Sequence, residues 1–251
     1  GLIQPAAQRK TVAEAAVRNS PPGKQVVVHV GTHGGTAEAV ELARHAAKIG
    51  AAAISSLPPI GNYSFQEIKD YYCELAVATD LPLLVYYFPS LAPSIVRIEQ
   101  ILELCEIPNV AGLKFTDSDL YRLAQLKKSG AVIFNGTDEI LAAGLLMGAD
   151  GGIGSFYNVI PGHFVKLYEE ATAGRWQQAR ELQLEINELI SIGLRYPVHP
   201  AVKQMLALSG IDCGKCVTPR RSLSPDEEAE IDQLLAQSSF ANLRIAPVET
   251  Q

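Results

Sequence analysis

The sequence predicts an α/β protein built on a parallel sheet, either open and doubly wound or closed as a barrel, with a helical C-terminal region. Three observations support this. Short β-rich runs alternate with amphipathic segments, the runs are almost continuously apolar, and no strand pattern returns after about Pro161. Strands buried on both faces and covered by helices produce this pattern. With 251 residues and 47% hydrophobic content, one large core is expected.

The strands are expected where β-branched and aromatic residues gather in short runs. These runs are KQVVVHV (24–30), AAAISSL (51–57), LPLLVYY (81–87), NVAGLKF (109–115), AVIFN (131–135) and GGIGSF (151–156). The segments between them, for example 36–51 and 64–80, have apolar residues at helical spacing and are interpreted as crossover helices. The C-terminal region is predicted to contain the helices 162–174, 175–194, 199–210 and 224–237.

The charge of the chain narrows the class of ligand. The formal net charge is −6 and the pI is near 5.4, so nucleic acid and anionic membranes would be repelled. The longest apolar stretch, near Leu141 to Ile160, is interrupted by Asp150, and the opening GLIQPAAQRK is not a secretory signal. We therefore expect a cytoplasmic protein with a small-molecule ligand, and neither a nucleic-acid nor a membrane partner.

No metal site is expected. Cys213 and Cys216 form a single C-x-x-C without the second ligand pair that zinc usually needs, and the five histidines are scattered. His33 is interpreted as a loop residue. The glycine-rich stretch 31–35 lacks both the dinucleotide pattern and the P-loop lysine, so no phosphate-bearing cofactor is expected.

One lysine stands out at a strand end. Lys114 lies near the end of the apolar run NVAGLKF, and the carboxyl ends of parallel strands are where ligands gather. Burying an ammonium group favours the neutral amine, which can attack a ketone to form a Schiff base. The alternative is a lysine that extends to solvent. Tyr86, at the end of LPLLVYY, is a candidate proton shuttle at the same edge, or else a rim tyrosine.

Together these motifs resemble the N-acetylneuraminate lyase and dihydrodipicolinate synthase family. They are Y-Y-F-P (86–89), G-L-K-F-T (112–116), the spacing 114 − 86 = 28 residues, and V-G-T (30–32). The resemblance implies a TIM-type (β/α)₈ barrel, of which six strands are recognisable here. The chain 1–251 would be one domain, with an incomplete barrel over 1–160 and the last barrel helix and C-terminal helices over 161–251. A homotetramer and a pyruvate-like keto acid ligand are also implied.

The resemblance also implies roles for individual residues, with a covalent imine in place of a cofactor. Lys114 would form the imine, Tyr86 would move protons and Thr116 would orient the substrate. The segments F-N-G-T-D-E (134–139) and G-I-G-S-F-Y-N (152–158) are more similar to the sialic acid lyases than to the synthases. Hydrogen bonds to a polyhydroxylated tail are expected from Asp138, Glu139 and Ser155, and Gly136 is expected to give the substrate access to the main chain. The acidic pair also suits a helix N-terminus.

Two departures from the family are visible. The family has two further strands before the first run seen here, and its G-[ST]-T-G-E turn, which holds the substrate carboxylate, would precede Gly1. We therefore expect a truncated sequence that is unstable alone, because a barrel lacking two strands has two open edges. In P-P-I-G-N-Y (58–63), Ile60 or Gly61 occupies the place of a relay aromatic residue, unless Tyr63 replaces it.

Three hypotheses for function remain at this point. The first is a Schiff-base lyase that cleaves N-acetylneuraminate, or a similar 2-keto sugar acid, to pyruvate and an aldose. The second is another pyruvate-dependent aldolase or a dihydrodipicolinate synthase-like enzyme, because specificity depends on a few tail contacts. The third is a non-catalytic, truncated relative that has kept Lys114 but lost the turn that binds the carboxylate.

Overall fold

A computed structural model describes residues 1–243, which fall into two compact units. The first unit comprises Gly1–Gly136 with Met147–Asp150, and the second comprises Thr137–Leu146 with the chain from Gly151 onward. The boundary falls in the segment that follows the strand predicted over 131–135. The expectation of one domain stays a prediction.

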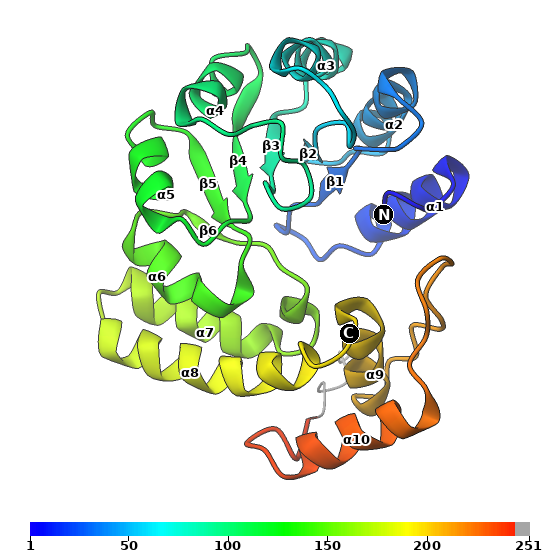
Figure 1. The fold of residues 1–251 in the computed structure, drawn as a ribbon, viewed down its shortest axis with the longest axis vertical. Coiled ribbons are helices and arrows are strands. Elements are labelled where there is room, and N and C mark those ends of the chain that lie inside the picture. Colours follow the sequence, from blue (N-terminus) through cyan, green and yellow to red (C-terminus); the bar gives the residue numbers. More distant parts are fainter. Residues whose placement is uncertain (244–251) are drawn as a thin grey trace. The chain divides into compact units, whose positions relative to one another are not determined.

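Five parallel strands form the sheet of the first unit, in the order of the sequence (Figure 1). They are β1 (Val27–His29), β2 (Ala53–Ser56), β3 (Leu83–Tyr87), β4 (Val110–Phe115) and β5 (Val132–Asn135). Each lies within one of the predicted runs, so the positions and the parallel pairing are confirmed. The strand predicted over 24–30 is the most shortened, because only Val27–His29 pair with β2.

Helices cover one face of this sheet (Figure 1). They are α2 (Thr36–Lys48), α3 (Phe65–Ala78), α4 (Ile98–Cys105) and α5 (Leu120–Lys127), preceded in the chain by α1 (Ala6–Arg18). The core between sheet and helices takes alternate strand residues, among them Val85, Leu113 and Ile133, all fully buried. Because successive strand residues point to opposite faces, Tyr86 and Lys114 lie on the other face. The expected crossover helices are thereby confirmed.

The turn before β4 depends on an asparagine in the left-handed region. Asn109 has φ +72°, and its amide nitrogen donates to the carbonyl oxygens of Ala76, Thr79 and Leu81 at 3.1, 3.1 and 2.9 Å. Its own carbonyl accepts from the Leu83 amide at 2.9 Å. One side chain therefore connects the end of α3 to the starts of two central strands.

Replacing Asn109 with alanine is expected to lower the free energy of unfolding by about 2–3 kcal/mol. The three contacts share the two hydrogens of one amide nitrogen, so the loss combines about two hydrogen bonds, about 1 kcal/mol each, with the poorer tolerance of alanine than of asparagine for positive φ, up to about 1 kcal/mol. Asn109→Gly is the matched control, because it removes the hydrogen bonds but accepts the backbone angle, and should lose less. Urea unfolding measures both; equal losses would mean that the backbone angle contributes nothing.

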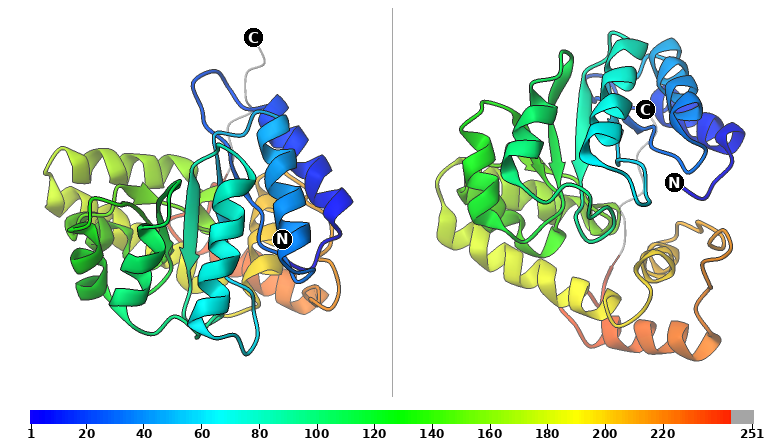
Figure 2. Two further views of the ribbon diagram at one scale, coloured as in Figure 1. Left: turned by 90° about the horizontal axis from the view of Figure 1, so that it is seen from above. Right: turned by 45° about the horizontal axis from the view of Figure 1, so that its top comes forward.

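The second unit is largely helical. After η1 (Asp138–Ile140), α6 (Leu141–Leu146), the short strand β6 (Gly151–Gly152) and η2 (Phe156–Asn158), it contains α7 (Pro161–Thr172), α8 (Trp176–Gly193), α9 (Val198–Leu208) and α10 (Pro225–Ala236). The four predicted C-terminal helices are confirmed, and α7 and α8 lie side by side in both views of Figure 2. The strand predicted over 151–156 is present but shortened to β6, because the chain leaves the strand after Gly152 and enters η2 at Phe156. No helix within residues 1–243 is long and apolar enough to cross a bilayer.

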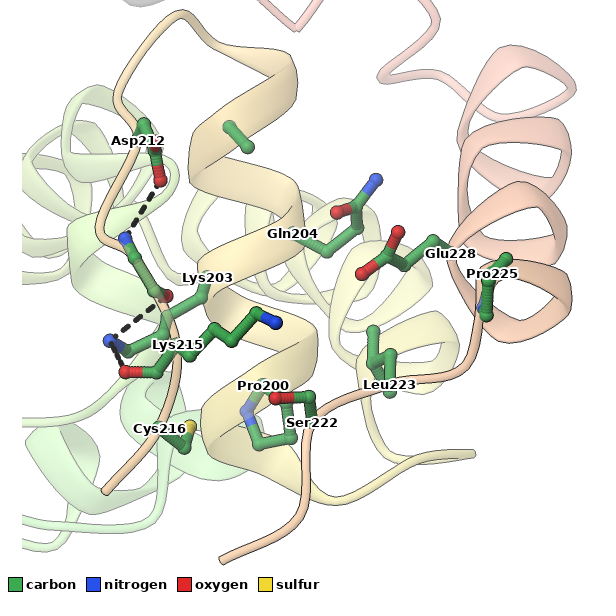
Figure 3. Close-up of a pocket in the computed structure, with 12 residues that line it drawn as sticks. Pro200, Lys203, Gln204, Asp212, Lys215, Cys216, Ser222, Leu223, Pro225 and Glu228 are labelled. Atoms are coloured by element: carbon green, nitrogen blue, oxygen red, sulfur yellow. Dashed lines mark hydrogen bonds between the residues drawn. The ribbon is translucent and has the colours of Figure 1, made fainter. Parts of the chain in front are cut away.

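A hollow of about 560 Å³ lies beside α9 in the second unit. Figure 3 shows Lys203 reaching from α9 to the loop that carries the C-x-x-C motif, where its ammonium donates to the carbonyls of Cys213, Gly214 and Lys215 at 2.7, 3.3 and 3.1 Å. Cys213 and Cys216 are both free thiols. Lys203 therefore holds the shape of this loop through its main chain.

Candidate active site

The predicted lysine and tyrosine meet on the face of the sheet opposite to the one that packs against α2–α5. Tyr86 of β3 pairs in register with Lys114 of β4, so their side chains leave adjacent strands at the same level. The Lys114 Nζ lies 3.8 Å from the centroid of the Tyr86 ring, which is the geometry of a cation–π contact. Both side chains are half-buried. The pair is thus placed by strand register rather than by a flexible loop.

A second aromatic ring supports Tyr86. Phe88 follows the end of β3, and its ring is nearly parallel to that of Tyr86, with centroids 5.9 Å apart and an interplanar angle of 13°. Phe88-Pro89 is the turn expected from the Y-Y-F-P motif. The stacked ring limits how far Tyr86 can tilt.

Thr116 and Gly136 lie at the ends of neighbouring strands. The Thr116 amide donates to the Tyr87 carbonyl at 2.8 Å, and the Gly136 amide donates to the Phe115 carbonyl at 2.7 Å. A Cβ at Gly136 would stand 1.9 Å from the Thr116 hydroxyl oxygen, so glycine is required for this approach. That hydroxyl is buried and has no hydrogen-bond partner among the described residues. An unsatisfied buried hydroxyl beside Lys114 suits contact with a ligand.

The profile of the Dihydrodipicolinate synthetase family matches residues 3–238. The chain belongs to this family. Among curated relatives, the N-acetylneuraminate lyase of Rhizobium meliloti (strain 1021) is 38% identical over 212 residues, which is 83% of this chain and 69% of the relative. N-acetylneuraminate lyase 2 of Escherichia coli O6:H1 is 35% identical over 95% of this chain and 79% of its own length.

Solved structures of sialic acid aldolases have the same fold as this chain over most of its length. The sialic acid aldolase of Ruminococcus gnavus superposes with a TM-score of 0.87 at 27% identity, covering 93% of this chain and 80% of the aldolase. CdNal from Clostridium difficile, in complex with mannosamine, superposes with a TM-score of 0.88 at 27% identity, over 96% of this chain and 82% of its own. The predicted TIM-barrel family fold and the resemblance to this family are confirmed, and the chain is a lyase of the class I aldolase type.

The other residues predicted to contact the substrate belong to the second unit. Asp138 is buried, its carboxylate accepts from the Phe156 amide at 2.8 Å, and a Cβ at Gly154 would stand 1.5 Å from Asp138 Oδ1. The Glu139 carbonyl accepts from the Asn187 side chain at 3.0 Å, and Ser155 is exposed. Asp138 therefore has a structural role in fixing η2, whatever else it binds.

His29 is a residue of this site that the sequence patterns did not single out. Its ring stands perpendicular to Tyr86, with centroids 6.0 Å apart. A histidine within the otherwise apolar run VVVHV was the available signal, and its register partner Ser55 also faces away from the helices. Of the loop candidates, His33 is exposed, and the Tyr63 ring is 42% exposed.

Acid should destabilise the protein through His29. Burial, with smaller contributions from Arg9 and Lys114, lowers the pKa of His29 from 6.5 to about 3. Between these values the unfolded chain binds one proton more than the folded one. The neutral His29 ring therefore makes its full contribution to the free energy of unfolding above about pH 6.5. As the pH falls from there toward about 3, the free energy of unfolding decreases by up to about 1.4 kcal/mol per pH unit. The free energy of unfolding, measured with urea from about pH 7 to about pH 4, should fall less steeply with decreasing pH in His29→Gln than in the parent protein. Equal dependence on pH in the two proteins would contradict this role of His29.

Proposed function

We propose that this chain is a Schiff-base lyase that cleaves N-acetylneuraminate, or a similar 2-keto sugar acid, to pyruvate and an aldose. The observation that carries the proposal is the contact of the Lys114 ammonium with the Tyr86 ring, in register on adjacent strands. A nucleophilic amine and a phenol at the carboxyl edge of a parallel sheet suit covalent catalysis on a ketone. The names of the relatives favour a sialic acid over other keto acids.

The chemistry assigns one task to each group. The neutral Lys114 amine attacks the C2 ketone of the open-chain sugar acid, and water leaves to give a protonated imine. The C4 hydroxyl then loses its proton and the C3–C4 bond breaks. The electron pair of that bond passes into the protonated imine to form an enamine. After the aldose leaves, C3 takes up a proton and water releases pyruvate from Lys114. The Tyr86 hydroxyl is the shuttle for these protons.

The other predicted site residues would bind the substrate. The unpartnered Thr116 hydroxyl would bond to the part of the substrate near the imine, and Gly136 gives access to the main chain. Glu139 and Ser155 are the polar candidates for contacts with the sugar tail, together with Asp138. Because a hydrogen-bonding site rejects analogues that leave its groups unpaired, these contacts would set the preference among keto acids.

Trapping the imine tests the proposal. The protein is incubated with pyruvate and borohydride, and intact mass and peptide mapping locate the reduced adduct. An adduct on Lys114 is expected, and its absence would refute the Schiff-base lyase. Release of pyruvate from N-acetylneuraminate is then compared with release from 2-keto-3-deoxygluconate. Preference for the latter would replace the sialic acid with another sugar acid, as the broader pyruvate aldolase hypothesis predicts.

Tyr86→Phe should separate binding from proton transfer. The variant keeps the ring under the Lys114 ammonium and beside Phe88 but removes the hydroxyl. We expect kcat to fall by about 100- to 10,000-fold, the usual value of a positioned acid or base, with KM little changed. Steady-state kinetics measure this, and trapping with pyruvate should still label Lys114. A kcat within a few-fold of the parent would assign the proton transfer to another group.

A further inference from the structure

The imidazole of His29 lies against Tyr86 although β2 separates their strands. His29 pairs in register with Ser55, and Ser55 with Leu84, so His29 stands one layer below Tyr86 on the same face of the sheet. From there its ring meets the Tyr86 ring at 90°, with centroids 6.0 Å apart. The His29 ring therefore packs against the Tyr86 ring from the adjacent layer of side chains on this face.

Three contacts hold this histidine in place. The Leu57 amide donates to Nε2 at 3.2 Å, and the Arg9 guanidinium donates to the His29 carbonyl at 2.6 Å. A Cβ at Gly31 would stand 2.9 Å from the ring carbon Cε1, so the ring packs where only glycine leaves room. Its side chain and its main chain are thus fixed independently.

The ring is neutral in the folded protein. Because an amide donates to Nε2, the ring proton is assigned to Nδ1. Burial lowers the pKa of His29 to about 3, with Arg9 and Lys114 as nearby cations. The histidine adds no second positive charge beside Lys114, so its contribution at neutral pH is one of shape.

The other neighbours of Tyr86 leave one motion open. Phe88 is nearly parallel to the ring, and the Lys114 ammonium lies over its face. Stacked rings resist tilting but can slide past each other, whereas a perpendicular ring blocks sliding. The Tyr86 hydroxyl is at the far end of the ring, so a small shift of the ring displaces it by about 1 Å, enough to slow a reaction by about 100-fold.

We infer that His29 is a positioning residue for the reaction, whose fixed ring sets where the Tyr86 hydroxyl stands relative to the Lys114 imine. This inference rests on the proposed function. It predicts that an aromatic ring at position 29 matters more than the hydrogen bond from Leu57. Three variants separate the two contributions, since His29→Phe keeps the ring, His29→Gln keeps an acceptor for the Leu57 amide, and His29→Ala keeps neither.

The rate of borohydride trapping with pyruvate is measured for each variant, together with kcat and KM for the sugar acid. We expect His29→Phe to retain the parent rates within about threefold, and the other two to lose about 10- to 100-fold in kcat with KM little changed. The pH profile of kcat should keep its shape in His29→Phe. Loss of one limb of that pH profile would show that His29 itself titrates during catalysis, which overturns the inference. A low kcat in His29→Phe with a normal kcat in His29→Gln would assign the effect to the hydrogen bond from Leu57, which also overturns it.

A double-mutant cycle completes the test, with kcat expressed per folded molecule for all four proteins. In the Tyr86→Phe background, His29→Ala should have no further effect on kcat, because it acts through the missing hydroxyl. Additive losses would overturn the inference. If the parent protein traps no pyruvate at all, the proposed function fails; if it traps pyruvate and His29→Ala matches it, only the role of His29 fails.

Discussion

Replacing Lys114 with arginine should lower kcat/KM by about four orders of magnitude or more and abolish the borohydride adduct. Arginine keeps a cation over the Tyr86 ring, so the contact seen at 3.8 Å can persist. Its guanidinium stays protonated, however, and forms no imine with a ketone. Removal of a covalent nucleophile has effects of this size because no other group supplies the same step.

The same variant should remain folded. Lys114 contributes a cation–π contact of about 0.5–1 kcal/mol, and arginine can replace it, so the free energy of unfolding should change by less than about 1 kcal/mol. Lys114→Met, which loses the charge, completes the comparison and should be equally inactive. Residual turnover of Lys114→Arg near the parent rate would show that the reaction needs a positive charge rather than an imine.

Gly112→Ala is expected to cost about 3 kcal/mol or more in the free energy of unfolding. Gly112 opens the motif G-L-K-F-T and pairs in register with Val132 of β5. A Cβ there would stand 1.9 Å from the Val132 carbonyl oxygen and 2.8 Å from its nitrogen, both main-chain atoms. The strands must separate to admit the methyl group, and overpacking against a backbone has no flexible side chain to absorb it.

Gly162→Ala is the matched control for this substitution. Gly162 lies in the first turn of α7, and a Cβ there would meet nothing within 4 Å. Alanine favours helix, so this variant should be neutral or more stable by about 0.5–1 kcal/mol. Urea unfolding of both variants gives the comparison. A Gly112→Ala protein as stable as the parent would show that β5 moves aside at little cost.

The sequence pattern predicts where the strands lie in the chain better than it predicts which of their side chains point toward the helices. LPLLVYY is apolar throughout, so nothing in it distinguishes Val85, which packs under the helices, from Tyr86, which faces away from them. The register of β3 and β4 decides this, and it depends on contacts far apart in the chain. The run GGIGSF predicts a full strand, but glycine has weak strand propensity and the strand β6 comprises only Gly151–Gly152.

The chemistry of the site was easier to predict than its supporting contacts. Lys114 and Tyr86 are reactive types at strand ends, and the resemblance of their motifs to the family singles them out. The roles of His29 and Asn109 depend on groups far away in the chain, such as the Leu57 amide and the Leu81 carbonyl, each 28 residues distant. Local patterns carry no information about such partners. The carboxylate of Asp138 was likewise expected to face a substrate, and its bond to the Phe156 amide could only be seen in three dimensions.

That bond has a practical consequence for altering the preference of this enzyme by directed evolution. A library randomised at Asp138 would remove the acceptor of the Phe156 amide and leave a void against Gly154 in most of its members. Selection on growth or colour would then score soluble yield together with substrate choice. Randomising the exposed Ser155 instead separates the two, and activity per folded molecule becomes the quantity that is selected.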